Sequence, residues 1–315
     1  MRVKGTLLLA AVVAAGAVTG FGTTATAEPA APDQPIVHIA PKVAKTKAAG
    51  SGAAGRDFTG DHRPDIIARS ASTGGLFLYP HSGNYNGTST YSAARLLDSS
   101  WGSMTWIGAA DLSGDGLADV VSIDDVGVMR VAVNVGGTRL APNRVINYGW
   151  DINDLVIVTD YNGDGYDDLM GRPGRYQDFN IYYNNGGVTP TTTFAAPQVA
   201  ISGIGPVTAL FGDFTRDGVP DMLYTVESGN MYVYDLVGNR AVLANRGWYA
   251  MDQLSATDVN GDGAPDLLSR DNYTGDLYAS THSGSFDLDS NGWATSMLRD
   301  KVVVGTGWFM HNLIT

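Results

Sequence analysis

The nine residues Asp160-Tyr161-Asn162-Gly163-Asp164-Gly165-Tyr166-Asp167-Asp168 decide how the rest of the chain is organised. Side chains that carry oxygen stand at the first, third, fifth and ninth positions of this stretch. Gly165, at the sixth position, tolerates the positive φ of a sharp turn, which can aim the carbonyl of Tyr166 at the same point as the carboxylates. Calcium takes roughly 6–8 oxygen ligands, so the spacing predicts a loop that holds a hard cation.

The stretch recurs five times, as DFTGDHRPD from Asp57, DLSGDGLAD from Asp111, DYNGDGYDD from Asp160, DFTRDGVPD from Asp213 and DVNGDGAPD from Asp258. The first residues of successive copies are 54, 49, 53 and 45 residues apart. Self-similarity at such a period indicates a propeller or an array of repeats. Five metal-free, Asx-rich turns are the alternative interpretation, although a turn alone does not require three converging carboxylates.

Each loop is expected to offer four side chains and the carbonyl of its seventh residue to one calcium ion, up to five ions in all. The expected ligand residues, loop by loop, are Asp57, Thr59, Asp61, Arg63 and Asp65; Asp111, Ser113, Asp115, Leu117 and Asp119; Asp160, Asn162, Asp164, Tyr166 and Asp168; Asp213, Thr215, Asp217, Val219 and Asp221; and Asp258, Asn260, Asp262, Ala264 and Asp266.

The composition narrows the classes of function. The chain has 315 residues, no cysteine and a formal net charge of −12. The lack of cysteine excludes disulfides, thiolate metal sites and a cysteine nucleophile. The negative charge argues against nucleic acid or an anionic membrane surface as a partner. Much of this charge is local, because the first, fifth and ninth positions of the five loops hold 15 of the 32 acidic residues.

Three segments are expected along the chain. Residues 1–27 resemble a secretory signal, with Arg2 and Lys4 before a short apolar run and an A-x-A cleavage site at residues 25–27. The run is too short to span a membrane, so we expect a secreted, extracellular protein with no membrane span. Residues 28–55, rich in Ala, Pro and Lys, predict a flexible linker. Residues 56–315 carry the repeats.

The repeats predict an all-β fold. Each acidic loop is followed by a short apolar strand, a turn, an alternating strand such as residues 76–79, a Gly-rich turn and a third strand. A fourth strand then leads into the next loop, and four strands per repeat make a propeller blade. A Trp stands ten residues before three of the loops, at Trp101, Trp150 and Trp248, whereas Gly203 takes this place before the fourth loop.

The two ends of the repeat region complement each other. Trp308 begins a further copy of the strand that precedes a loop, but the chain ends before a loop could follow. The first loop, at Asp57, has no such strand before it. We therefore predict that the C-terminal strand completes the first blade and closes a ring of five four-stranded blades, which leaves no blade edge exposed. A monomer is expected.

The loops and strands from residue 56 onward resemble the FG-GAP and VCBS repeat families, the calcium-loop propeller repeats also found in integrin α-chain heads. The pattern D-x-[NST]-x-D-G-x-x-D is complete in the third loop, and Leu-Leu-Ser-Arg at residues 267–270 is similar to repeats of secreted actinobacterial proteins. The resemblance implies a calcium-stabilised extracellular propeller that binds ligands or partners. It implies no single activity.

Some loops depart from this pattern. His62 replaces the sixth-position Gly of the first loop, so this site is expected to be the weakest. The third positions of three loops offer neutral hydroxyls, and Arg216 adds a positive charge to the fourth loop. Five repeats are also fewer than the seven of the integrin head.

Several other residues are candidates for function. His81 and His282 stand in equivalent turns and are interpreted as turn variants or as the two sides of one groove. The four repeated Trp residues are expected to pack between blades, with sugar stacking as the alternative. The remaining candidates are Arg residues that follow the first strand of a blade, and we expect them to support the framework rather than a ligand: Arg69, Arg172 and Arg270.

No catalytic residue is predicted, since the sequence contains no G-x-S-x-G, H-E-x-x-H or P-loop motif. The expected function is therefore that of a secreted, calcium-binding, non-catalytic module whose favoured ligand is a cell-surface or cell-wall glycan. A protein-adhesion module is one alternative. An extracellular metal-dependent hydrolase or lyase built on the propeller is another.

Overall fold

The computed structural model describes residues 36–37 and 56–314. The predicted signal, residues 1–27, and all but two residues of the predicted linker, residues 28–55, lie outside the described residues. Within the described part there is no α-helix, and three one-turn 3-10 segments occur at Gly87–Ser89, Trp248–Ala250 and Trp308–Met310. No helix in this part is long and apolar enough to cross a membrane.

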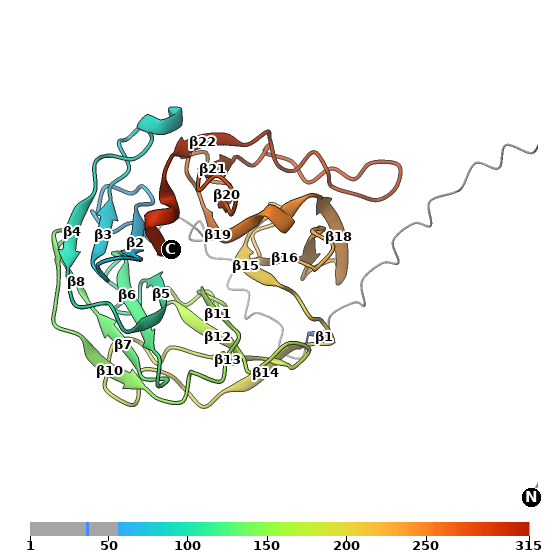
Figure 1. The fold of residues 1–315 in the computed structure, drawn as a ribbon. Helices are drawn as coiled ribbons and strands as arrows, with labels where there is room; N and C mark the ends of the chain where they lie inside the picture. The colour runs from blue at the N-terminus through green and yellow to red at the C-terminus, as the bar shows by residue number, and fades with distance from the viewer. Residues whose placement is uncertain (1–35, 38–55, 315) are drawn as a thin grey trace, which may run out of the picture. The chain divides into compact units, whose positions relative to one another are not determined.

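Five antiparallel sheets of four strands stand around a common centre as the blades of a propeller, which confirms the predicted fold (Figure 1). We number each blade by the acidic loop that it contains and give its strands from the innermost outward. Blade 1 contains β23 (His311–Ile314), β2 (Ile66–Ser70), β3 (Leu76–Tyr79) and β4 (Arg95–Asp98); blade 2 contains β5 (Met104–Ala110), β6 (Asp119–Asp124), β7 (Met129–Ala132) and β10 (Arg144–Asn147); blade 3 contains β11 (Leu155–Thr159), β12 (Asp168–Arg172), β13 (Phe179–Tyr182) and β14 (Gln198–Ser202); blade 4 contains β15 (Thr208–Gly212), β16 (Asp221–Thr225), β17 (Met231–Asp235) and β18 (Arg240–Asn245); and blade 5 contains β19 (Met251–Thr257), β20 (Asp266–Asp271), β21 (Leu277–Ser280) and β22 (Val302–Gly305).

Three short strands add to this plan. β1 (Ile36–Val37) pairs antiparallel with the outer strand β14 of blade 3. β8 (Asn134–Val135) and β9 (Arg139–Leu140) form a small hairpin between the third and fourth strands of blade 2.

The C-terminal strand closes the ring as predicted. β23 pairs antiparallel with β2, with Ala68 opposite Ile314 and Arg69 opposite Leu313. Blade 1 therefore takes its inner strand from the end of the chain and its other three strands from the start of the repeats (Figure 1). The edge of β2 that would otherwise face the centre is paired, so no backbone groups are left open there.

The core lies between the blades. The second strand of every blade is buried on both faces or nearly so, because its two faces pack against neighbouring blades. Its middle is mostly apolar, whereas polar residues such as Asp119 and Arg172 stand at the strand ends. Five clusters of buried apolar side chains, one at each blade interface of the described propeller, make up this core. Each cluster includes the second residue of one acidic loop: Phe58, Leu112, Tyr161, Phe214 and Val259.

The propeller has two different ends. Each inner strand leads toward an acidic loop, so the five loops share one end of the propeller, which we call the loop end. The turn before each inner strand lies at the opposite end, together with the turns between second and third strands. Because the repeated Trp residues stand in the turns that precede the inner strands, we call this the tryptophan end.

The Trp residues pack between blades, as predicted. Trp101, Trp150 and Trp308 are buried in three of the interface clusters, and Trp248 packs against a fourth. The backbone N–H of each Trp donates to the carbonyl of a turn glycine in the preceding blade, at 2.8–3.1 Å. The four pairs are Trp101 with Gly74, Trp150 with Gly127, Trp248 with Gly229, and Trp308 with Gly275.

At the interface of blades 3 and 4, Ile204 takes the place of the Trp. Gly203 has a φ of +81°, close to that of Gly149, Gly247 and Gly307, which directly precede three of the Trp residues. Counting ten residues back from the fourth loop selects Gly203. The backbone conformation shows instead that Ile204, the next residue, is the structural equivalent of the Trp residues. The segment from here to the loop is one residue shorter than in the other repeats. Ile204 is buried in the cluster between blades 3 and 4.

Candidate metal centres

The carboxylate at the first position of each acidic loop, called here the first carboxylate, accepts hydrogen bonds from the backbone of that loop. In the third loop, Oδ1 of Asp160 accepts hydrogen bonds from the backbone N–H groups of Gly163 and Asp164, at 2.8 and 3.1 Å. Its Oδ2 accepts from Gly165 at 3.0 Å. The carboxylates at the first position of the other loops accept hydrogen bonds from backbone N–H groups of their own loops in the same way: Asp57, Asp111, Asp213 and Asp258.

The carboxylate at the ninth position, called here the ninth carboxylate, bonds both the start of the loop and the segment after the third strand. Oδ2 of Asp168 accepts from the backbone N–H of Tyr161 at 3.1 Å, and Oδ1 accepts from the N–H of Asn184, just beyond the third strand, at 2.8 Å. The ninth carboxylates are buried in all five loops, and four of them make both kinds of bond: Asp65, Asp119, Asp168 and Asp266.

The third and fifth positions are more open. Oδ1 of Asp164 accepts from the N–H of Tyr166 at 2.9 Å, and the amide of Asn162 donates to Oδ2 of Asp164 at 3.0 Å. The loop at residues 258–266 repeats this arrangement. The third-position hydroxyls of the other loops are buried near the ninth-position carboxyl of their own loop. No hydrogen bond of normal geometry joins them to a described residue: Thr59, Ser113 and Thr215.

Every loop turns at its fourth and sixth positions through the left-handed region. The sixth residues have φ angles from +64° to +89°, and Gly fills this position in all loops but the first. His62 adopts φ +64° there, and Arg216 adopts φ +66° at the fourth position of its loop. Side chains rarely occupy this region. Arg216 does not stay within its own loop, because its guanidinium donates to the carbonyl of Gly263 in the next one.

Burial raises the pKa of every ninth carboxyl. The pKa is about 6 at Asp65 and Asp119, about 7 at Asp266, and about 8 at Asp168 and Asp221. The bonds from backbone N–H groups lower these values, whereas the charges of the first or fifth carboxylate of the same loop raise them. Ionising these carboxyls therefore costs free energy at a partly desolvated place, and a bound cation would offset that cost.

The oxygen chemistry of the loops fits a hard cation, but the carboxylates are not drawn together into a closed cage. Within residues 56–314, no group of three or more His, Asp or Glu side chains lies close enough to hold a metal ion. The first and ninth carboxylates instead serve backbone N–H groups. The buried third-position hydroxyls without a partner in the described residues are the atoms that a cation would satisfy. The ligand set in the five loops stays a prediction.

In four of the five blades, a residue that follows the third strand bonds the acidic loop of the adjacent blade. His81 and His282 are buried, and their Nε2 atoms lie 3.0 Å from the carbonyls of Val259 and Phe214 in adjacent loops. Their Nδ1 atoms accept from the N–H groups of Gly83 and Gly284, which leaves Nε2 as the donor of a neutral imidazole. The two His residues are therefore inter-blade ties and do not line a groove.

Two Asn residues that sequence reasoning missed make the same tie in blades 2 and 3. Nδ2 of Asn134 donates to the carbonyl of Phe58 at 2.8 Å, and Nδ2 of Asn184 donates to that of Leu112 at 3.1 Å. The sequence contains a pattern that marks these ties, because each of the two Asn and two His residues precedes a Gly by two or three positions. That Gly donates its N–H to the side chain of the Asn or His.

Blade 4 has no residue of this kind. A short turn after β17 replaces the longer segment of the other blades. As a result, Oδ1 of Asp221 is buried without a hydrogen-bond partner among the described residues. Among the described residues, blade 4 thus lacks the His or Asn bond to the loop of blade 3, and Ile204 stands in place of the Trp before its inner strand.

The three framework Arg residues lie at the tryptophan end, away from the acidic loops. Arg172 forms a two-pronged ion pair with Asp154, at 2.8 Å for both bonds, and donates to the carbonyl of Pro206 in blade 4. Arg270 pairs with Asp252 in the same way, and Arg69 donates to the carbonyl of Gly102 in blade 2 at 3.0 Å. They support the framework, as predicted, but by joining blades and not by neutralising the loop carboxylates.

Comparisons with solved structures give weak likenesses. A lectin from Agrocybe aegerita, described as recognising non-reducing terminal N-acetylglucosamine, is 20% identical with a TM-score of 0.44 over 80% of this chain and 65% of its own. A TcdB2-TccC3-TEV structure is 13% identical with a TM-score of 0.33 over 71% of this chain and 12% of its own. The V. cholerae biofilm matrix protein Bap1 is 15% identical with a TM-score of 0.28 over 89% of this chain and 40% of its own.

This chain spans less than two thirds of the length of each of these three structures. A search of curated proteins found no match. The FG-GAP-like repeat model, in contrast, matches three times, at residues 57–122, 111–171 and 160–224. Each match begins at the first Asp of an acidic loop and runs through the next loop into the strand that follows it. Because these matches together cover more than half of the chain, it belongs to the FG-GAP-like repeat family.

Proposed function

We propose that the protein is a secreted, calcium-stabilised propeller that acts as a non-catalytic binding module, with a cell-surface or cell-wall glycan as its ligand. The calcium ions would be held by the five acidic loops, through the residues at positions one, three, five, seven and nine. Their contribution is structural. The first and ninth carboxylates bond the backbone of their own blade, so a cation there would stabilise the blade rather than face a substrate.

The observation that carries the glycan proposal is the placement of the exposed aromatic rings. Five exposed Tyr and Phe side chains, with 53–75% of their surface accessible, all stand in turns at the tryptophan end. They are Tyr148, Tyr176, Tyr249, Tyr273 and Phe309. Exposed apolar groups gathered on one face mark an interaction surface, and the C–H face of a pyranose can stack on such rings as other apolar groups do.

The test is a glycan array with the purified protein, together with a screen against polysaccharide and ester substrates in calcium and in EDTA. We expect binding without turnover. Tyr249→Ala combined with Tyr273→Ala should weaken the binding. Val237→Ala, at a residue of the loop end that is 63% exposed, should not. Turnover that requires metal would instead favour the hydrolase or lyase. Binding to surface proteins but to no glycan would favour the adhesion module.

A further inference from the structure

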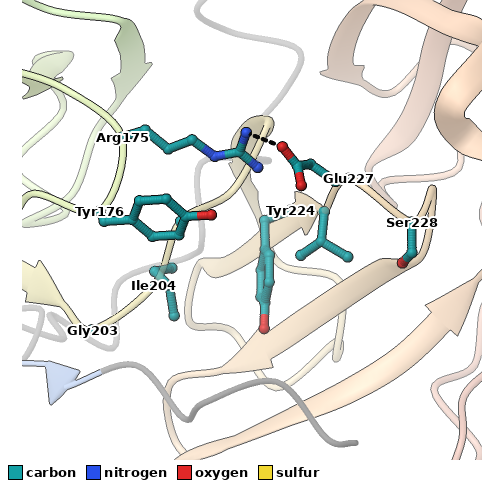
Figure 2. A pocket seen from close by; sticks show the side chains of 9 residues that line it. Arg175, Tyr176, Gly203, Ile204, Tyr224, Glu227 and Ser228 are labelled. Atoms are coloured by element: carbon teal, nitrogen blue, oxygen red, sulfur yellow. Dashed lines mark hydrogen bonds and ion pairs between the residues drawn. The ribbon is translucent and has the colours of Figure 1, made fainter. Parts of the chain in front are cut away.

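A pocket of about 300 Å³ opens at the tryptophan end between blades 3 and 4 (Figure 2). Its walls include Tyr176 from the turn of blade 3, Ile204 from the segment before β15, and Tyr224 from β16. The size falls at the lower end of the ~300–1,000 Å³ of small-molecule sites. The pocket does not touch the acidic loops, which lie at the other end of the propeller.

The pocket exists because one interface departs from the other four. Where the other interfaces have a Trp, this one has the smaller Ile204. A second position, three residues after the last Asp of each acidic loop, also differs. Blade 4 has Tyr224 there, whereas the other blades have small residues: Ala68, Ser122, Gly171 and Ser269. The Tyr224 ring is buried in the same apolar cluster as Ile204, between blades 3 and 4. The remaining space is left open as the pocket.

Tyr176 is held at the mouth of this pocket in a strained conformation. Its φ is +69°, and 73% of its surface is exposed. The ring lies so close to Gly205 that a Cβ on that residue would be 2.2 Å from a ring carbon. The guanidinium of Arg175 stands 5.3 Å from the centre of the ring. Strain of this kind persists where the surroundings impose it and is common at ligand sites.

The polar groups of the pocket carry no net charge. Nη1 of Arg175 and Oε1 of Glu227 are 2.5 Å apart and join the turns of blades 3 and 4 across the opening (Figure 2). Nε of Arg175 is buried and has no hydrogen-bond partner in the described part of the chain. Ser228 adds a hydroxyl beside Glu227. Glu227 would repel an anionic ligand and Arg175 would repel a cationic one. The site therefore favours a neutral ligand with several hydroxyls.

We infer that this pocket binds one neutral pyranose residue, with an apolar ring face against Tyr176 and hydroxyls bonded to Arg175, Glu227 and Ser228. Carboxylate and guanidinium groups bond hydroxyls more strongly than neutral partners do. The inference rests on the proposed function and adds to it the place where a sugar residue enters. The exposed rings of the other blades would contact the rest of a longer glycan.

The experiment uses the full propeller in calcium and a panel of methyl glycosides of neutral hexoses and N-acetylhexosamines at millimolar concentration. Saturation-transfer NMR and calorimetry detect binding. Glu227→Gln should weaken it roughly tenfold, as expected when a hydrogen bond to a charged group is lost. Tyr176→Gly should also weaken it, although Gly accepts this φ and relieves the strain. A thermal melt no lower than that of the wild type would show that Tyr176→Gly does not act through folding.

A second variant is designed to fill the pocket and to keep the fold. Ile204→Trp combined with Tyr224→Ser gives this interface the pair of residues found between blades 4 and 5, Trp248 and Ser269. We expect a normal melt and complete loss of methyl glycoside binding. If this variant still binds methyl glycosides, the pocket is not the site. If the wild type binds oligosaccharides on the array but no methyl glycoside, the inference fails while the proposed function stands. If it binds no glycan at all, both fail.

Discussion

His62 and Arg216 adopt positive φ angles of 64° and 66° at loop positions where the other copies have Gly. A side chain in this region costs roughly 1–2 kcal/mol relative to Gly. The fold tolerates the cost because the first carboxylate of each loop fixes the turn, as Asp57 does by accepting the N–H of His62 at 2.7 Å.

His62→Gly should therefore raise the free energy of unfolding by about 1 kcal/mol. The imidazole of His62 is almost fully exposed and lies 4.0 Å from Oδ2 of Asp57, so its loss removes little attraction. Urea unfolding of the variant and the wild type, each in calcium, measures the difference. A less stable variant would mean that the His side chain contributes to the loop in a way that its geometry does not show.

Asp164→Ala should cost more stability in calcium than Asp61→Ala. The two residues make the same local bond, Oδ1 of each accepting an N–H two positions on, at 2.9 Å and 3.0 Å. Asp164 also accepts a bond from the Asn162 amide, so the loss for Asp164 in EDTA should include that bond. The further loss that appears only in calcium should report the bound ion, about 1.4 kcal/mol at ten times Kd. Equal losses in calcium, measured by urea unfolding, would contradict the ranking of the two loops.

At the scale of single elements, β23 has a larger role than its four residues suggest. It supplies the inner strand of blade 1, and the Trp308 before it fills the interface with blade 5. The guanidinium of Arg270 in blade 5 bonds the carbonyls of Trp308 and His311. The strand therefore links the last blade to the first.

Truncation after Gly307 should abolish the stable monomer. It opens the edge of β2 and removes a buried Trp, and loss of a buried Trp side chain alone costs ~3–5 kcal/mol. The total approaches the ~5–15 kcal/mol stability of a domain. We expect aggregation or strand-swapped oligomers in size-exclusion chromatography. A truncated protein that stays monomeric and melts like the full chain would show that β23 is not needed for closure.

The closure strand should also make the fold sensitive to acid. His311 is buried, with Nε2 2.5 Å from the Tyr79 hydroxyl, and the charged groups beside it are Arg69 and Arg270. Burial and the charge of Arg270 lower the pKa of His311 below its ordinary value. This neutral imidazole contributes stability above the unfolded pKa of about 6.5. That contribution is lost as the pH falls toward the lower folded pKa.

His311→Gln removes the titrating group and keeps a polar side chain. The free energy of unfolding, measured in urea from pH 7 to pH 5, should fall less steeply in this variant than in the wild type. The loop carboxyls, whose pKa values are raised, contribute the opposite slope to both proteins and cancel in the comparison. Parallel pH profiles would mean that His311 is protonated in the folded state as readily as in the unfolded chain.

For the propeller as a whole, stability depends on five similar interfaces arranged in a ring. Each interface has its own apolar cluster, and at four of them a His or Asn bonds a loop of the adjacent blade. An ion in one loop would therefore stabilise two blades. The interface of blades 3 and 4 lacks both the Trp and the tie, and it is where the pocket opens.

EDTA should lower the melting temperature by several degrees, and added calcium should restore it. A ligand that binds only the folded state stabilises by about 1.4 kcal/mol per site at ten times Kd, and 1 kcal/mol shifts the melting temperature of a domain this large by roughly 2–4 °C. Differential scanning calorimetry in calcium, EDTA and EDTA with excess calcium measures the effect. Identical melting curves would remove the calcium hypothesis.

The sequence alone determined the fold class, the number of blades and the closure. The reason is that the acidic loop recurs at a blade-sized period, and that the strand missing before Asp57 reappears after Gly307. It also located the residues that turn each loop, since those turns depend on local backbone conformation. The packing of the Trp residues could be predicted for the same reason, because a bulky side chain repeated at one position of four blades contacts the equivalent neighbour in each.

Only the tertiary structure decided what happens between blades. The ties of Asn134 and Asn184 and the partners of His81 and His282 join residues more than 60 positions apart, and no local pattern encodes such a distance. The same holds for the pocket. Its walls combine Ile204, which is smaller than the Trp at the other interfaces, with Tyr224, which is larger than its counterparts in the other blades. The volume that these two residues leave open depends on how blades 3 and 4 pack together. A sequence fixes the size of each side chain, but the volume left between side chains is set by packing.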